Sequence, residues 1–178
     1  SYIEISAIIF ILLGSLPFIA YIKFINGNKM IFFNDIQIQT FFKVILVSII
    51  ILSIYLAFTN LDTFSFMAIL FNIISILTGT GYVNAQFDNW GSFSLVLFLI
   101  LMFIGGCAGS TTGGLKVFRF QILFSYLNLH LKKMLKPHSI SASRFNGKII
   151  SDTTYESVMS FFFLYILTFF LSALLLSF

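Results

Sequence analysis

Thr78-Gly79-Thr80-Gly81-Tyr82 is a small polar stretch that directly follows an apolar segment, residues 64–77. As a helix, that segment would span about 21 Å, whereas the hydrocarbon core of a bilayer is about 30 Å thick. Segments of this length are typical of re-entrant helices, which line cavities rather than facing lipid. We therefore expect residues 64–77 to dip into a membrane and to end there in a polar loop.

Lysine and arginine are absent from residues 44–115, on both sides of this stretch. All ten basic residues lie in two groups, one around a first polar connection and one in or near a second. They are Lys23, Lys29 and Lys43, and then Lys116, Arg119, Lys132, Lys133, Lys136, Arg144 and Lys148. Because basic residues concentrate in the cytoplasmic loops of membrane proteins, both connections are expected in the cytoplasm. The residues between them should leave the cytoplasm and return.

The composition supports a lipid environment. Of the 178 residues, 59% are hydrophobic and 9% are charged, whereas a soluble domain carries about 25% charged residues. Four apolar segments are long enough to discuss as spans: residues 5–21, 41–58, 93–127 and 157–178. A single cysteine gives no disulfide framework, and the basic residues form no stripe with aromatic ones, so nucleic acid is not an expected partner. We expect an all-α membrane protein and, from its apolar ends without an initial Met, a piece of a longer one.

The order of segments between the two basic connections predicts a pore loop. A span leads out, the short helix dips in, the polar stretch follows, and a connection over residues 84–91 leads into a returning helix. A potassium ion crossing a membrane must lose its water, and ringed backbone carbonyls can replace that shell. Glycines allow the torsions that aim successive carbonyls at one axis, and the carboxyl end of the short helix is partly negative. The expected filter residues are Thr78, Gly79, Thr80, Gly81 and Tyr82. The alternative is an ordinary turn outside the membrane.

A second polar stretch contains five of the eleven glycines. It reads Gly105-Gly106-Cys107-Ala108-Gly109-Ser110-Thr111-Thr112-Gly113-Gly114. Glycine costs about 1 kcal/mol relative to alanine inside a helix, so this run should break the returning helix. We expect a flexible intramembrane loop below the filter, able to obstruct or clear the pore. The alternative is a helix-packing motif of small residues spaced four apart. A phosphate-binding loop does not fit, because no Lys-Ser/Thr follows the last glycine and no strand precedes the run.

Three passages resemble the Trk-type potassium uptake proteins, the TrkH and KtrB family. Residues 105–119 resemble the intramembrane gating loop of that family over a long and specific match. Residues 75–82, with Thr80-Gly81-Tyr82 at their centre, resemble its third filter loop, although Gly79 replaces the usual Thr. Residues 13–18 resemble the end of the helix that closes its second repeat.

The resemblance implies a fold and a domain order. The family arranges four linked helix–pore helix–helix repeats around one pore, each with a re-entrant filter loop. Residues 1–25 would end the second repeat and residues 26–36 would be a cytoplasmic connection. Residues 37–125 would form the complete third repeat, with a broken inner helix. Residues 126–149 would be a basic cytoplasmic connection, and residues 150–178 would begin the fourth repeat.

The resemblance also implies a function. The chain would supply one quarter of a potassium filter, with the ion at Thr80 and Gly81, and the loop that gates it. The transported ion would be K⁺, taken up by symport, with no covalently bound cofactor and no enzymatic activity. Partners would be the remaining repeats, a second copy of the protein, and a cytosolic nucleotide-binding regulatory subunit similar to TrkA. The location would be the bacterial inner membrane.

Two other functions fit parts of the sequence. A secondary transporter with broken helices would also carry glycine-rich interruptions, but it should show a matching break in another segment. Residues 5–21, 41–58 and 157–178 show none so marked. A non-conducting membrane scaffold would use the glycines only to pack helices. An enzyme is not expected, because no acid, base and nucleophile share the apolar region. Glu4, Asp62 and Asp88 lie near segment ends or outside.

Overall fold

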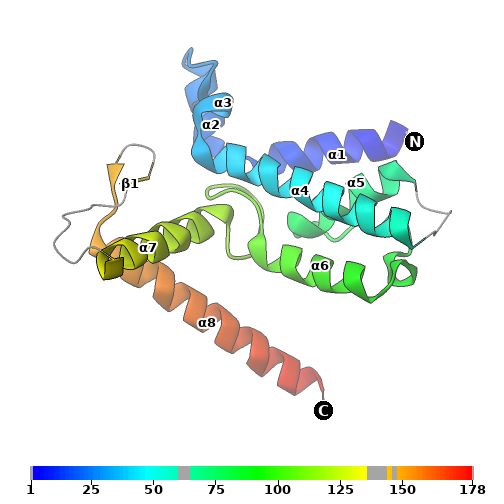
Figure 1. Ribbon diagram of the computed structural model, residues 1–178. Coiled ribbons are helices and arrows are strands. Elements are labelled where there is room, and N and C mark those ends of the chain that lie inside the picture. The colour runs from blue at the N-terminus through cyan, green and yellow to red at the C-terminus, as the bar shows by residue number, and fades with distance from the viewer. Residues whose placement is uncertain (1, 60–64, 136–143, 146–147, 178) are drawn as a thin grey trace. The chain divides into compact units, whose positions relative to one another are not determined.

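The computed structural model describes residues 2–59, 65–135, 144–145 and 148–177, and in this part the protein is almost entirely helical (Figure 1). The elements in chain order are α1 (Tyr2–Ser15), α2 (Phe18–Ile25), α3 (Ile31–Asn34), α4 (Ile36–Phe58), α5 (Phe66–Leu77), the 3₁₀ turn η1 (Phe87–Trp90), α6 (Ser92–Ile104), α7 (Val117–Leu135), β1 (Arg144–Phe145), β2 (Lys148–Ile149) and α8 (Asp152–Leu176). The strands are two residues each and pair antiparallel. The expected all-α fold is confirmed.

Two compact units make up the chain, Ser1–Val117 and Phe118–Phe178. In the second unit α7 and α8 pack around Ile122, Tyr155 and Val158. The guanidinium of Arg119 lies 3.7 Å from the centre of the Phe161 ring, a cation–π contact that joins the two helices. The domain boundaries expected from the sequence remain predictions. Parts of the expected connection over residues 126–149 lie outside the described residues.

Two helices are long and apolar enough to cross a membrane: α4 and, within α8, Thr153–Leu176. The 23 residues of α4 span about 35 Å as a helix, enough for a hydrocarbon core of about 30 Å. The 12 residues of α5 reach only about 18 Å, and α6 has 13. The short dipping helix and the interrupted third segment are therefore as expected.

The first apolar segment differs from expectation, because it contains a sharp break. Between α1 and α2 the chain bends by 89°. Pro17, which stands just before α2, has no N–H to donate and its ring does not fit an α-helix interior. The expectation that residues 5–21 hold no marked break was wrong. The segment is apolar on both sides of the proline, so hydropathy alone concealed the bend.

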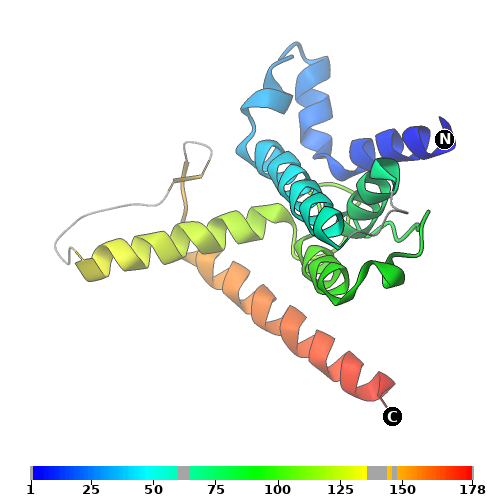
Figure 2. The same cartoon turned by 45° about the vertical axis from the view of Figure 1, so that its right-hand side comes forward.

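The core of the first unit is α5, which packs against α1, α4 and α6 (Figure 2). Nine of its 12 residues are buried, and Ile69, Ile73 and Leu77 are fully so. Phe41 of α4 is also fully buried and belongs to the same hydrophobic cluster. A short helix enclosed by three others presents its carboxyl end at a fixed place, and the polar stretch begins there.

Candidate pore loop and glycine loop

The segment expected to form the filter, residues 78–82 and called the filter segment below, continues directly from the end of α5. Gly79 and Gly81 have φ values of +71° and +78°, in the left-handed region, whereas Thr80 between them does not. A Cβ added at either glycine would meet nothing within 4 Å. Conformation rather than space therefore requires glycine at both positions, since a side chain in this region costs roughly 1–2 kcal/mol.

Backbone hydrogen bonds turn the amides of the filter segment back toward α5. The N–H of Gly79 donates to the carbonyl of Ile76 at 3.1 Å. The N–H groups of Thr80 and Gly81 both donate to the carbonyl of Ser75, at 3.0 and 3.3 Å. Within the described part of the chain, no hydrogen bond reaches a carbonyl of residues 78–82. This arrangement leaves a row of backbone oxygens available to another ligand.

The two threonines of the filter segment are linked to each other and to the helix. The hydroxyl of Thr78 donates to the carbonyl of Ile74 at 2.8 Å and lies 2.9 Å from the hydroxyl of Thr80. Thr78 is buried, whereas Thr80 is exposed. The Tyr82 side chain is 65% exposed in this chain. The structure thus brings Thr78, Gly79, Thr80 and Gly81 together at the end of α5 and leaves Tyr82 at the edge.

Asn72 is a residue of this site that sequence reasoning missed. It is fully buried in α5, and its Oδ1 accepts a hydrogen bond at 3.4 Å from the N–H of Asn84, beyond the filter segment. Its Nδ2 and the hydroxyl of Ser75 have no hydrogen-bond partner among the described residues. A buried amide in an otherwise apolar helix of 12 residues was the signal that could have found it.

The glycine loop, residues 105–114, breaks the returning helix as expected. The helix α6 ends at Ile104 and α7 begins at Val117. A Cβ at Gly105 would lie 2.3 Å from the carbonyl oxygen of Gly113, so the loop closes on itself too tightly for a side chain there. The N–H of Val117 donates to the carbonyl of Gly106 at 3.0 Å and closes the base of the loop. The backbone is not helical between α6 and α7, which rules out the helix-packing motif.

Hydroxyl groups inside the glycine loop hold its turns together. The N–H of Gly106 donates to the hydroxyl of Thr112 at 3.2 Å, and that hydroxyl lies 2.7 Å from the hydroxyl of Ser110. Ser110 in turn donates to the carbonyl of Cys107, whose side chain is fully buried. The loop therefore has a defined internal structure, in which Ser110 and Thr112 make hydrogen bonds to other loop residues.

The glycine loop docks on the break between α1 and α2. The carbonyls of Gly14 and Ser15 lie in the last turn of α1, where a helix leaves its carbonyls without internal partners. Thr111 donates to the carbonyl of Gly14 twice, from its N–H at 3.2 Å and from its hydroxyl at 2.9 Å. The N–H of Cys107 donates to the carbonyl of Ser15 at 3.2 Å. The loop thus satisfies the carbonyls that the break exposes.

Two further hydrogen bonds complete this docking. The N–H of Phe18 has no acceptor within α2, because it stands at the start of that helix, and it donates to the carbonyl of Gly109 at 2.9 Å. The Oε1 atom of Gln37, in the first turn of α4, accepts from the N–H of Ala108 at 3.1 Å. Three helices that are distant in sequence from the loop therefore hold it. Neither Gln37 nor the α1–α2 break was recognised from the sequence as part of the site.

A cleft of about 350 Å³ joins the filter segment to the glycine loop. Its lining comes from the last turns of α1, from the base of the filter segment and from the far end of the loop. The lining residues are Phe10, Ile11, Gly14, Ser15, Thr78, Gly79, Thr80, Thr111, Thr112 and Gly113. Five of the lining residues carry a hydroxyl group, although they come from three parts of the chain: Ser15, Thr78, Thr80, Thr111 and Thr112.

Comparisons with known proteins match the chain to transport proteins. A family model described as a cation transport protein, TrkH, matches residues 1–177. The chain is 36% identical to the Trk system potassium uptake protein TrkI of Halomonas elongata, over 90% of this chain and 33% of that protein. It is 31% identical to the Trk system potassium uptake protein TrkH of Escherichia coli K12, over 93% of this chain and 35% of that protein.

A solved structure gives the same result. The crystal structure of the potassium transporter TrkH from Vibrio parahaemolyticus superposes with a TM-score of 0.87 and 28% identity, covering 96% of this chain and 38% of that one. The chain spans about a third of the length of the relatives it matches. The chain has apolar helices long enough to cross a membrane, and it is similar to these transporters. It is therefore an integral membrane protein. The chain belongs to the TrkH family of cation transport proteins.

Proposed function

We propose that this chain supplies one quarter of a pore through which K⁺ enters the cell, with residues 78–82 as one quarter of the filter. The observation that carries the proposal is the backbone pattern of that segment. Its amides bond back to Ser75 and Ile76, and its carbonyls accept no hydrogen bond from the described residues. A dehydrated K⁺ ion requires such a row of unpaired carbonyl oxygens. The named relatives are potassium uptake proteins.

The ion would bind at Thr80 and Gly81. The hydroxyl of Thr80 is held 2.9 Å from that of Thr78, which positions a further oxygen beside the backbone carbonyls. The carboxyl end of α5, immediately before Thr78, carries partial negative charge and favours a cation nearby. Gly79 offers no side-chain oxygen, so the backbone provides the ligands at that position.

The glycine loop would act as the gate of this pore. The shared cleft supports this role, because residues of the loop and of the filter segment line the same space. They are Thr111, Thr112 and Gly113 of the loop, and Thr78 and Thr80 of the filter segment. A loop docked there obstructs the path below the filter, and a loop that leaves the cleft clears it. Hydrogen bonds of ordinary length, rather than a continuous helix, hold the loop, so it can be released without unfolding α6 or α7.

The whole protein would extend beyond this chain. The remaining repeats of the same polypeptide would complete the ring, and the assembly would be a homodimer in the bacterial inner membrane. A cytosolic nucleotide-binding subunit similar to TrkA would dock on the basic side. Lys132 and Lys133, in the last turn of α7, lie in the connection expected there. The named relatives are transport proteins rather than enzymes.

Potassium uptake by the full-length protein, in cells that lack their own potassium transporters, tests the filter. Replacing Gly81 by Asp places a side chain at φ +78°, at a cost of roughly 1–2 kcal/mol, and a carboxylate among the carbonyls. We expect uptake to be abolished. Gly27→Asp is a matched control, because Gly27 also has a left-handed φ, +96°, and open space around it, but lies in the first connection. Uptake that survives in the Gly81→Asp variant would overturn the filter assignment.

The break between α1 and α2 favours a second candidate, a coupled transporter with two discontinuous helices at its binding site. In this chain the interrupted segment at Pro17 meets the glycine loop, and the loop binds the freed carbonyls. Current–voltage measurements on the reconstituted full-length protein separate the two. A pore gives a current that follows the K⁺ gradient alone, whereas a coupled transporter gives one whose reversal potential shifts with the gradient of a second ion.

A further inference from the structure

Gln37 makes a side-chain contact with the glycine loop from the first turn of α4. Its side chain is only 7% exposed, and its Oε1 accepts from the N–H of Ala108 at 3.1 Å. Burying an amide is unfavourable unless it is hydrogen-bonded, so this bond explains why a glutamine stands at a buried position. The carboxylate of Asp35 caps α4 by accepting from the N–H of Gln37 at 2.9 Å, which fixes the residue's place.

Ala108 lies between two other anchored residues. The N–H of Cys107 bonds to α1 and the carbonyl of Gly109 bonds to α2, in both cases through backbone atoms. Gln37 holds the residue between them from α4, through a side chain. Three consecutive loop residues are thus held by three different helices. Of these bonds, the one from Gln37 is the bond that a substitution can remove while the backbone contacts stay in place.

We propose that Gln37 is a positioning residue that latches the glycine loop in its docked conformation, so that losing this bond favours release of the loop from the cleft. The inference rests on the proposed function of the loop as a gate. Asp35 and α3 connect Gln37 to residues 26–36, the connection expected on the cytoplasmic side. A movement of that connection would reach the loop through a single hydrogen bond.

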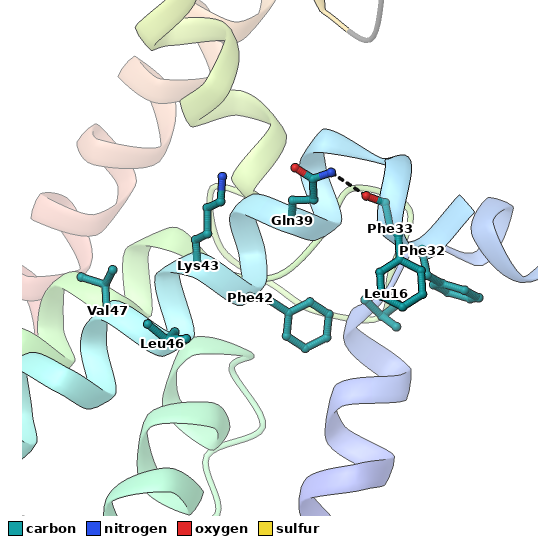
Figure 3. Close-up of a pocket in the computed structure, with 8 residues that line it drawn as sticks. All are labelled: Leu16, Phe32, Phe33, Gln39, Phe42, Lys43, Leu46 and Val47. Carbon is teal, nitrogen blue, oxygen red and sulfur yellow. Dashed lines mark hydrogen bonds between the residues drawn. The ribbon is translucent and has the colours of Figure 1, made fainter. Parts of the chain in front are cut away.

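Gln39 provides a matched comparison two residues along the same helix. Its Nε2 donates to the carbonyl of Phe33, and its side chain lies at an apolar groove with Phe42 and Lys43, on a part of α4 that does not hold the loop (Figure 3). It is exposed, whereas Gln37 is buried. A substitution at Gln39 removes a glutamine hydrogen bond from the same helix turn and leaves the loop's contacts unchanged.

The modification rate of Cys107 measures docking independently of transport. Cys107 is fully buried in the docked loop, so a water-soluble methanethiosulfonate reagent should reach it only after release. In the full-length protein, mass spectrometry of the peptide that contains Cys107 gives this rate for that residue alone. We expect Gln37→Met, close in size but without an acceptor, to raise the rate by up to about tenfold, which corresponds to about 1.4 kcal/mol.

One further variant makes the comparison specific. Gln39→Met should leave the modification rate of Cys107 unchanged. The proposal is overturned if Gln37→Met leaves the rate unchanged, or if Gln39→Met raises it equally, since a general loosening of α4 would explain that result. If Gln37→Met does not accumulate in the membrane, Gln37→Ala takes its place with the same expectation.

Potassium flux gives the second readout. If loss of the Gln37–Ala108 hydrogen bond releases the glycine loop, Gln37→Met should raise the K⁺ flux, whereas a damaged fold would lower it. Absence of uptake in the unsubstituted protein would overturn the proposed function and would leave the Cys107 comparison valid. Faster modification of Cys107 together with unchanged flux would overturn the role of the loop as a gate, while slower or unchanged modification would overturn the latch itself.

Discussion

Alanine substitutions at three glycines of one loop should destabilise the protein in a fixed order. Gly113 has no left-handed φ, and a Cβ there would meet nothing within 4 Å, so Gly113→Ala should be nearly neutral. Gly109 has φ +73° but open space, so Gly109→Ala should cost only the conformational strain, roughly 1–2 kcal/mol. Gly105 has the same φ of +73°, and its Cβ would collide with the carbonyl oxygen of Gly113 at 2.3 Å.

The collision at Gly105 adds an overpacking cost to the strain. Forced shifts in a packed region cost about 1–3 kcal/mol, so Gly105→Ala should cost about 2–5 kcal/mol in total. This total is a large share of an overall stability of about 5–15 kcal/mol. Each full-length variant would be heated in detergent, and the fraction that still runs as a folded peak in size-exclusion chromatography would be measured. Equal midpoints for Gly105→Ala and Gly109→Ala would refute the reasoning, because these two variants differ by the collision alone.

Two further predictions concern the surroundings of the filter segment. Replacing Asn72 by Leu removes the acceptor for the N–H of Asn84 and should lower the ratio of K⁺ to Na⁺ uptake. Asn72→Asp keeps an acceptor and should preserve this ratio better than Asn72→Leu. Equal ratios for the two variants in paired flux measurements would contradict the prediction. Gly91→Ala places a Cβ 2.5 Å from the hydroxyl of Tyr55, at φ +92°, and should lower the thermal midpoint in detergent. The added change Tyr55→Phe should recover part of the loss because it removes the colliding oxygen, and no recovery would count against the collision.

The parts of the fold that the sequence predicted depend on length and on local composition. The helix α5 is too short to cross a membrane, and counting the residues of its apolar segment is enough to show this. The glycine loop interrupts its helix because its residues cannot stabilise one, which is also a local property. Residues 78–82 form a loop because they directly follow the end of α5, and their role as a filter stays a prediction. All three depend on residues close together in the chain.

The parts that the sequence did not predict depend on partners far away in the chain. Pro17 breaks a run that is apolar on both sides, so hydropathy does not reveal the bend. Gln37 stands as a polar residue at a helix start, and only the folded chain shows that it meets Ala108, 71 residues later. Asn72 was overlooked for the same reason, since its partner Asn84 lies across the filter segment. Sequence patterns report local structure, whereas these contacts depend on tertiary packing.

The docking of the glycine loop on the α1–α2 break has a consequence for biosynthesis. Gly14 and Thr111, which bond to each other, are separated by 97 residues. A ribosome adding about 5–20 residues per second needs on the order of 5–20 seconds to make that stretch. During this interval the carbonyls at the end of α1 have already been synthesised, but the loop that satisfies them has not. Because an unpaired carbonyl is unfavourable in hydrocarbon, the nascent chain must keep this turn in contact with water or with the insertion machinery until the glycine loop arrives.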